Sequence, residues 1–262
     1  MVSTELVMAM GHRAAVAAAT APPPRRASGA GGDHEGPDMN GTHERPPRDA
    51  VATSRVGQVF ENPATGERAV ILTDPRTDPD RRLVAHLYVR PGGRVALEHV
   101  HPTLTERFLV LRGHLAVALD GRTSTLGPGE RAQVPAGVRH DWWHSGDEET
   151  QALVEVDPGD RFVEMLTSLW GRVRDSGARR GIPGPLQMAV SGAAYRDVMV
   201  AASPPRWVQE VLFATLGPIG RILGRRPSYT EYTQSATVVE PDPAALALLT
   251  PDGRIDWTGA AR

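Results

Sequence analysis

Residues 93–113 read Gly93-Arg-Val-Ala-Leu-Glu-His99-Val-His101-Pro-Thr-Leu-Thr-Glu106-Arg-Phe-Leu-Val-Leu-Arg-Gly113. Side chains two residues apart share one face of a β-strand, so His99 and His101 should point in the same direction. Pro102 ends this strand because it has no N–H to donate, and a short turn follows. A second strand that begins at Glu106 would return its carboxylate to the side of the two imidazoles.

A second segment supplies a fourth candidate ligand. It reads Gly129-Glu-Arg-Ala-Gln-Val-Pro135-Ala-Gly137-Val-Arg-His140-Asp-Trp-Trp-His144. Glycine and proline turn signals bracket a short strand at residues 131–134, and His140 opens the next strand. Imidazole nitrogen suits zinc, copper, iron and nickel, whereas carboxylate oxygen suits harder ions. The candidate ligands of one divalent transition metal ion (Fe, Mn, Ni, Cu or Zn) are therefore His99, His101, Glu106 and His140.

These two segments resemble the motifs of the cupin family. The first cupin motif is a glycine, five residues, His-x-His, three or four residues, a glutamate, six residues and a glycine. It is matched by Gly93, His99, His101, Glu106 and Gly113. The second is a glycine, five residues, Pro-x-Gly, two residues, a histidine, three residues and an asparagine. It is matched by Gly129, Pro135, Gly137 and His140, but His144 stands where asparagine is usual.

This resemblance covers residues 57–157 and implies a single-domain, type-2 cupin. Such a protein is a small antiparallel β-barrel of jelly-roll type, often dimeric, and its metal ligands fall on the four positions named above. The departure at His144 leaves all four ligand positions intact. We therefore expect a mainly β fold, with the barrel at residues 56–158. Short strands with frequent turn signals support a sandwich or barrel independently of the resemblance.

The N-terminal segment differs from the barrel region in composition. Residues 1–50 are rich in alanine, proline and glycine, which predicts disorder. Glu5 makes the start acidic, and His12 and Arg13 interrupt the apolar run, so a secretory signal is disfavoured and we expect a cytoplasmic protein. Met39 is an alternative to the first methionine as the start of translation.

A helical extension is expected over residues 159–240. Apolar residues recur there at helical spacing, beginning with Phe162, Met165, Leu166, Leu169, Trp170 and Val173. A second helix is expected at residues 186–200, and a third, from Ser203, should be interrupted at Gly217-Pro218. Arginines beside the apolar stripe of the third helix allow a membrane-surface helix, but we favour packing on the barrel or on a partner subunit. Residues 241–262 should form a loosely attached tail.

Composition argues against several classes of function. The formal net charge is −2, and the chain has no concentrated basic stripe of the kind that nucleic-acid binding needs. The chain has no cysteine, which removes disulfides, thiolate nucleophiles and cysteine-based zinc sites. The apolar runs are too short to span a bilayer. We expect a homodimer that binds a small molecule, with no nucleic-acid or membrane partner.

Three imidazoles and one carboxylate leave coordination positions for water, O₂ or a substrate. Our first hypothesis is a mononuclear, dioxygenase-like oxidoreductase that acts on a small enolisable or phenolic molecule, with Glu106 as the catalytic base. The expected pocket is lined by Phe108, Val110, Val117, Trp142 and His144. For His144, a hydrogen bond to a loop at the rim is the competing interpretation. Two other functions stay open: a redox-neutral metal-dependent isomerase, epimerase or cyclase, and a cupin that binds a ligand without turnover.

Overall fold

A computed structural model describes residues 56–75, 77–234 and 237–257 of the chain. The expectations of disorder in residues 1–50 and of a start at Met39 lie outside these residues. In chain order, the described residues form β1 (Val59–Asn62), β2 (Glu67–Thr73), β3 (Leu83–Val89), β4 (His99–Val100), β5 (Thr105–Arg112), β6 (Leu115–Leu119), β7 (Arg122–Leu126), β8 (Arg131–Val134), β9 (Arg139–His144), β10 (Thr150–Asp157), α1 (Asp160–Ser176), α2 (Pro185–Ala194), β11 (Val200–Ala201), α3 (Arg206–Ile222), α4 (Thr230–Gln234) and α5 (Pro243–Leu246).

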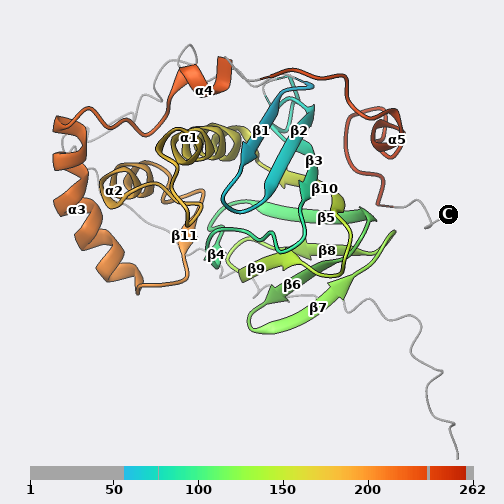
Figure 1. Ribbon diagram of the computed structural model, residues 1–262, viewed down its shortest axis with the longest axis horizontal. Coiled ribbons are helices and arrows are strands. Elements are labelled where there is room, and N and C mark those ends of the chain that lie inside the picture. Colours follow the sequence, from blue (N-terminus) through green and yellow to red (C-terminus); the bar gives the residue numbers. More distant parts are fainter. Residues whose placement is uncertain (1–55, 76, 235–236, 258–262) are drawn as a thin grey trace, which may run out of the picture. The chain divides into compact units, whose positions relative to one another are not determined.

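The strands form two antiparallel sheets that enclose a common core, as in a jelly roll (Figure 1). The six-stranded sheet has the order β1-β2-β3-β10-β5-β8, and the five-stranded sheet has the order β11-β4-β9-β6-β7. The expected mainly β fold with C-terminal helices is confirmed. Its strands lie in two sheets rather than in one closed sheet.

Strand β5 illustrates how alternation along a strand assigns side chains to two faces. Glu106, Phe108 and Val110 are buried, and the latter two join the core between the sheets. Leu109 belongs to a second apolar cluster with residues of β2, β3 and β10. Fully burying an apolar side chain of this size contributes about 1.5–3 kcal/mol, so the six-stranded sheet is stabilised from both faces.

Helix α1 packs onto the core, as its apolar spacing predicted. Phe162, Met165 and Trp170 are buried in the core, and Trp170 meets Phe60 of β1 edge to face with ring centroids 6.4 Å apart. The helix ends at Gly177, whose φ of 62° is left-handed and costs glycine little. Packing of this helix holds the extension against the two sheets.

Helix α3 is continuous where the sequence predicted an interruption. It contains Pro218 and still runs unbroken to Ile222. A proline ring clashes with the Cβ of the residue before it, and that residue is Gly217, which has none. The expected break is therefore wrong. Gly220 allows α3 to approach α2 closely, because a Cβ at this position would lie 2.9 Å from the carbonyl oxygen of Leu186.

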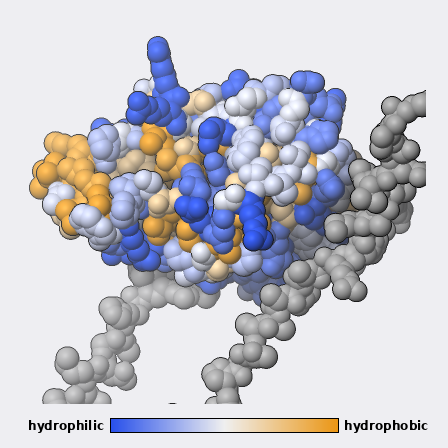
Figure 2. All heavy atoms as spheres, turned by 90° about the horizontal axis from the view of Figure 1, so that it is seen from below, coloured by the Kyte–Doolittle hydropathy of each residue, from blue (hydrophilic) through white to orange (hydrophobic). Residues whose placement is uncertain are grey.

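The outward face of α3 is apolar and exposed. Trp207 is 71% exposed and Ile222 is 84% exposed. Figure 2 shows apolar atoms gathered over this helix, at the left of the view. Packing of α3 within the chain is thus limited to its inner side. Among the described residues, no helix combines the length and the apolar character that crossing a membrane requires.

Residues 241–257 pack on the outer face of the six-stranded sheet, so the expectation of a loose tail is wrong for them. Ala245 is fully buried and Ile255 is 1% exposed in the second apolar cluster. The backbone N–H of Ile255 donates to Glu155 Oε2 at 3.0 Å. The cause is the apolar outer face of the sheet, which needs cover from water. Residues 258–262 lie outside the described part of the chain.

The helical extension also returns a strand to the barrel. Strand β11 pairs antiparallel with β4, so that Ala201 lies opposite His99. The expected boundary between a barrel at 56–158 and an extension at 159–240 therefore does not separate two independent structures. The extension completes the five-stranded sheet beside the first candidate ligand.

Candidate metal centre

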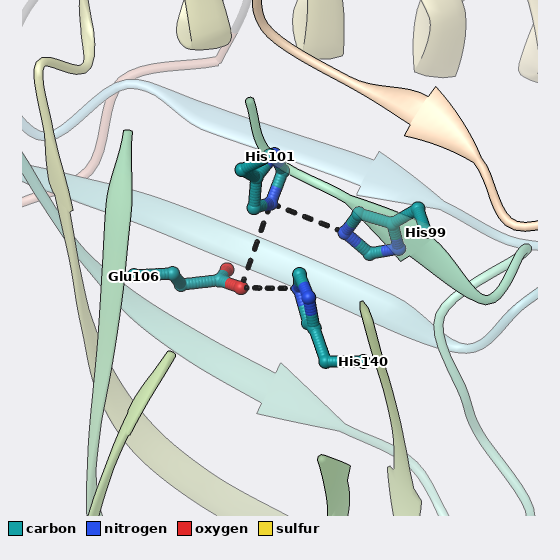
Figure 3. Close-up of side chains that lie close together, drawn as sticks. All are labelled: His99, His101, Glu106 and His140. Carbon is teal, nitrogen blue, oxygen red and sulfur yellow. Dashed lines mark hydrogen bonds and ion pairs between the residues drawn. The ribbon is translucent and has the colours of Figure 1, made fainter. Parts of the chain in front are cut away.

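Four side chains converge in the interior between the sheets (Figure 3). His99 lies on β4, Glu106 on β5 and His140 on β9, and His101 directly follows β4. Pairing of β4 with β9 sets His99 opposite His140. Each of the four is buried, and one ligand atom from each lies within 4.8 Å of the others. The structure thus brings together all four of the side chains that the two sequence segments singled out.

Each of the three imidazoles donates its Nδ1–H to a backbone carbonyl. His99 and His140 bond to the carbonyl oxygen two residues earlier in the chain, at 2.7 Å and 3.1 Å. His101 Nδ1 lies 2.8 Å from the carbonyl oxygen of Val198. A carbonyl can only accept, so Nδ1 carries a proton in each ring. When a ring is neutral, its Nε2 lone pair is therefore directed into the cluster, which is the arrangement that metal-bound histidines adopt.

The spacing of the ligand atoms fits one shared cation. His99 Nε2 lies 3.1 Å from His101 Nε2, and His140 Nε2 lies 3.2 Å from Glu106 Oε2. The distance from His101 Nε2 to Glu106 Oε2 is 3.7 Å. Two ligand atoms at about 2.1 Å from one ion and at right angles to each other are about 3 Å apart. Two facing nitrogen lone pairs at 3.1 Å repel unless a proton or a cation lies between them. The cluster is therefore compatible with a divalent metal ion.

The charges of the cluster favour a cation as well. Burial, together with the neighbouring imidazoles, lowers the pKa of His99 to about 3, so this ring is neutral at pH 7. Burial alone would raise the pKa of Glu106, but hydrogen bonds with His101 and His140 hold it far below its usual range. Burial would lower the pKa of His140, but the hydrogen bond and charge of Glu106 outweigh it and raise this pKa. A buried carboxylate thus attracts positive charge, as a proton on His140 or as a metal ion.

The C-terminal extension covers this cluster. The ring of Phe162 in α1 meets the imidazole of His101 edge to face, with centroids 5.6 Å apart. Sequence patterns marked Phe162 only as an apolar position of a helix. They could not mark Val198, because its backbone carbonyl would accept the hydrogen bond from His101 whatever its side chain. The extension therefore orients one candidate ligand and shields it from water.

The residues expected to line a pocket take two different positions. Phe108, Val110, Val117 and Trp142 belong to the packed core between the sheets and are at most 5% exposed. Their role as a pocket lining stays a prediction. His144 lies outside the cluster: its Nδ1 accepts from the N–H of Gly92 at 3.4 Å, and its Nε2 donates to the carbonyl of Glu148 at 2.7 Å. These contacts agree with the competing interpretation of His144 as a residue that holds loops.

A second buried carboxyl, which the sequence patterns did not mark, opens strand β2. Glu67 is 5% exposed and accepts a hydrogen bond from the hydroxyl of Thr65. Burial raises the pKa of Glu67 to about 8. The hydrogen bond from Thr65 lowers this pKa, and the charge of Glu106 raises it further. At pH 7 this carboxyl is therefore protonated, whereas Glu106 is ionised. A lone glutamate at the start of a strand carries no sequence signal that separates it from a solvated one.

Comparison with known proteins relates this chain to one family. The model of the cupin domain matches residues 85–156. Polyketide synthase CurC of Streptomyces cyaneus is 31% identical over 93 residues, which are 36% of this chain and 60% of that protein. Protein SchB of Streptomyces halstedii is 30% identical over 93 residues, which are 36% of this chain and 67% of that protein.

A solved structure is similar to part of this chain. A cupin 2 domain-containing protein from Halorhodospira halophila is 27% identical, with 36% of this chain and 66% of that chain covered and a TM-score of 0.32. Of the two Streptomyces relatives, CurC is matched by this chain over less than two thirds of its length. The matched region contains all four clustered side chains but ends before helix α1.

Proposed function

This chain belongs to the cupin superfamily, and from that premise we propose that its buried cluster holds one divalent transition metal ion. We propose further that the protein is a metal-dependent oxidoreductase of dioxygenase type, active on a small enolisable or phenolic molecule. A cytoplasmic homodimer is part of the same proposal.

The observation that carries the metal site is the direction of the three imidazoles. Each Nδ1–H is held by a backbone carbonyl, so three Nε2 atoms and one carboxylate oxygen are left to converge. The two ring nitrogens of His144 bond instead to two separate loops, outside the cluster. Supporting hydrogen bonds of this kind raise metal affinity by about 10- to 100-fold.

Each residue of the proposed site has its own role. When bound, such a metal polarises a carbonyl or enolate oxygen and, if it is redox-active, engages O₂. Glu106 supplies the negative charge that offsets part of the metal charge, and its depressed pKa makes it a ligand first and a weak base. Phe162 keeps bulk water from His101. Glu67 retains a proton at pH 7 because burial raises its pKa to about 8.

The relatives support the substrate class. One of them is named as a polyketide synthase. A polyketide is a chain of alternating carbonyl and methylene groups, whose methylene protons are acidic, so it enolises readily and forms phenols on ring closure. An enolisable or phenolic substrate for this chain is consistent with that relationship.

A redox-neutral reaction is the second candidate, and the same relative favours it. The word synthase denotes assembly of a carbon skeleton rather than its oxidation. A cyclase or isomerase would use the metal only to stabilise an enolate oxygen, and imidazole and carboxylate ligands serve both kinds of reaction.

Oxygen uptake separates the two candidates. Protein reconstituted with Fe²⁺, Mn²⁺, Ni²⁺, Cu²⁺ or Zn²⁺ is incubated with a 1,3-diketone and with a catechol, in air and without oxygen. Consumption of O₂ that matches product formation supports the first candidate, and product formed without oxygen supports the second. The variant Glu106→Gln should abolish either activity, whereas His144→Gln should retain it. Absence of any product with every metal would reject both candidates and leave ligand binding.

A further inference from the structure

A cavity of about 570 Å³ lies outside the two sheets, within the C-terminal extension. Helices α1, α2 and α3 line it together with strand β11 and the loop at residues 178–184, and it opens to solvent on one side. None of the four clustered side chains lines it, and neither do the residues that were expected to form a pocket in the barrel. Its size falls within the range of about 300–1,000 Å³ that is typical of small-molecule sites.

The wall of the cavity is apolar and adaptable. Its apolar lining includes Met165, Met188, Met199, Leu169 and Phe213. Methionine side chains are flexible and polarisable, and they fit irregular apolar ligands. Two of the polar side chains in the wall already have partners. Gln209 donates to the carbonyl oxygens of Ala201 and Pro204, and Ser191 accepts from Gln187. The interior of the cavity therefore offers contact to an apolar group and few free hydrogen bonds.

Two arginine side chains lie at the edge of this cavity. Arg179 and Arg180 belong to its lining and are exposed. Other arginines of the extension are paired, such as Arg161 with Asp197 and Arg196 with Glu210. Neither Arg179 nor Arg180 forms an ion pair within the part of the chain that the structure describes. Adjacent guanidinium groups without a carboxylate partner favour an anion.

We propose that this cavity binds an amphiphile with one apolar chain and an anionic end group. The chain lies among the methionines, and the carboxylate or phosphate end meets Arg179 and Arg180 at the edge. This site does not depend on the proposed metal chemistry. The cavity does lie beside the metal-ligand cluster. Leu97 in its wall carries the carbonyl that holds His99, and Met199 in its wall follows Val198, whose carbonyl holds His101.

Calorimetric titration of the full-length protein with straight-chain carboxylates tests the site. Octanoate, decanoate and dodecanoate, each below its micelle concentration, should bind at one site per chain. Affinity should rise roughly fourfold for each added methylene until the cavity is full. Decyltrimethylammonium has the same chain length as decanoate and the opposite charge, and it should bind at least tenfold more weakly.

Two variants and two matched controls assign any binding to this cavity. The double change Arg179→Gln and Arg180→Gln should weaken decanoate binding about tenfold, because two exposed charge contacts are lost. The change Arg122→Gln, an exposed arginine on the distant strand β7, should leave binding unchanged. Met188→Trp should narrow the cavity and weaken decanoate binding, whereas Leu246→Trp on α5 should not. Circular dichroism confirms that each variant is folded.

The proposal fails if decanoate shows no saturable binding to the wild-type protein. It also fails if the folded Met188→Trp variant binds decanoate as the wild type does, or if decyltrimethylammonium binds equally well. Neither result would bear on the metal content of the protein, so failure of this site and failure of the proposed function are distinguishable.

Discussion

Between pH 7 and pH 5, the titration of His99 should cost metal-free protein a defined part of its stability. Burial and the neighbouring imidazoles lower the pKa of His99 from 6.5 to about 3. Over this pH range the folded protein keeps the ring neutral, whereas the unfolded chain takes up a proton at the ordinary pKa. A depressed histidine pKa therefore contributes stability that is present above about pH 6.5 and is lost as the pH falls toward 3.

The size of the effect follows from the two pKa values. A pH of 5 lies about 1.5 units below the pKa of the imidazole in the unfolded chain. Each pH unit corresponds to about 1.4 kcal/mol of free energy. Protonation of the unfolded chain at His99 thus costs the folded state about 2 kcal/mol at pH 5 relative to pH 7. His140 acts with the opposite sign, because its raised pKa contributes stability below about pH 6.5 that is lost at higher pH.

Urea unfolding of metal-free protein at pH 7 and pH 5, followed by circular dichroism, measures the effect. The variant His99→Gln cannot titrate and should lose about 2 kcal/mol less than the wild type between the two pH values. The variant His114→Gln removes an exposed histidine and should behave as the wild type. His140 is present in all three proteins, and only its coupling to His99 differs among them. Equal losses in His99→Gln and the wild type would refute the account of a buried, neutral imidazole.

Three further predictions concern packing beside the site, under the C-terminal segment and on helix α3. Phe162→Ala should lower the free energy of unfolding by about 3–5 kcal/mol and leave metal content unchanged, and loss of metal would make this ring part of the centre. Ile255→Ala should cost about 2–5 kcal/mol in urea unfolding, whereas Leu248→Ala, at 39% exposure, should cost much less; equal small costs would mean that the tail is loose. Trp207→Glu and Ile222→Glu should convert a dimer to a monomer in light scattering, and an unchanged mass would remove α3 from the interface.

The sequence patterns predicted the barrel strands and the candidate ligands well because both depend on local spacing. The strand expected at residues 131–134 is β8, with the same bounds. His99 and His101 are two residues apart, and Glu106 returns after one proline-terminated turn, so their convergence needs only strand alternation. His140 required the pairing of β4 with β9, which the order of the two motifs implied.

Features that depend on contacts distant in sequence were not predictable. The tail was expected to be loose because residues 241–262 are rich in proline and aspartate, but the apolar outer face of the sheet recruits Ala245 and Ile255. The carbonyl of Val198 reaches His101 across 97 positions of the chain, and no residue type is required for it. Pro218 was expected to break the helix, but the preceding Gly217 has no Cβ to clash with the proline ring, and α3 continues to Ile222.

Elemental analysis of the purified protein tests the central claim most directly. Wild type and His101→Ala are prepared in parallel, without chelators and without a metal-affinity resin, and their transition-metal content is measured per chain. We predict close to one metal ion per wild-type chain and a severe loss in the folded variant, because the change removes one of the four converging ligand atoms. Full metal content in His101→Ala, or no metal in the wild type even after reconstitution, would contradict the assignment of this cluster as a metal centre.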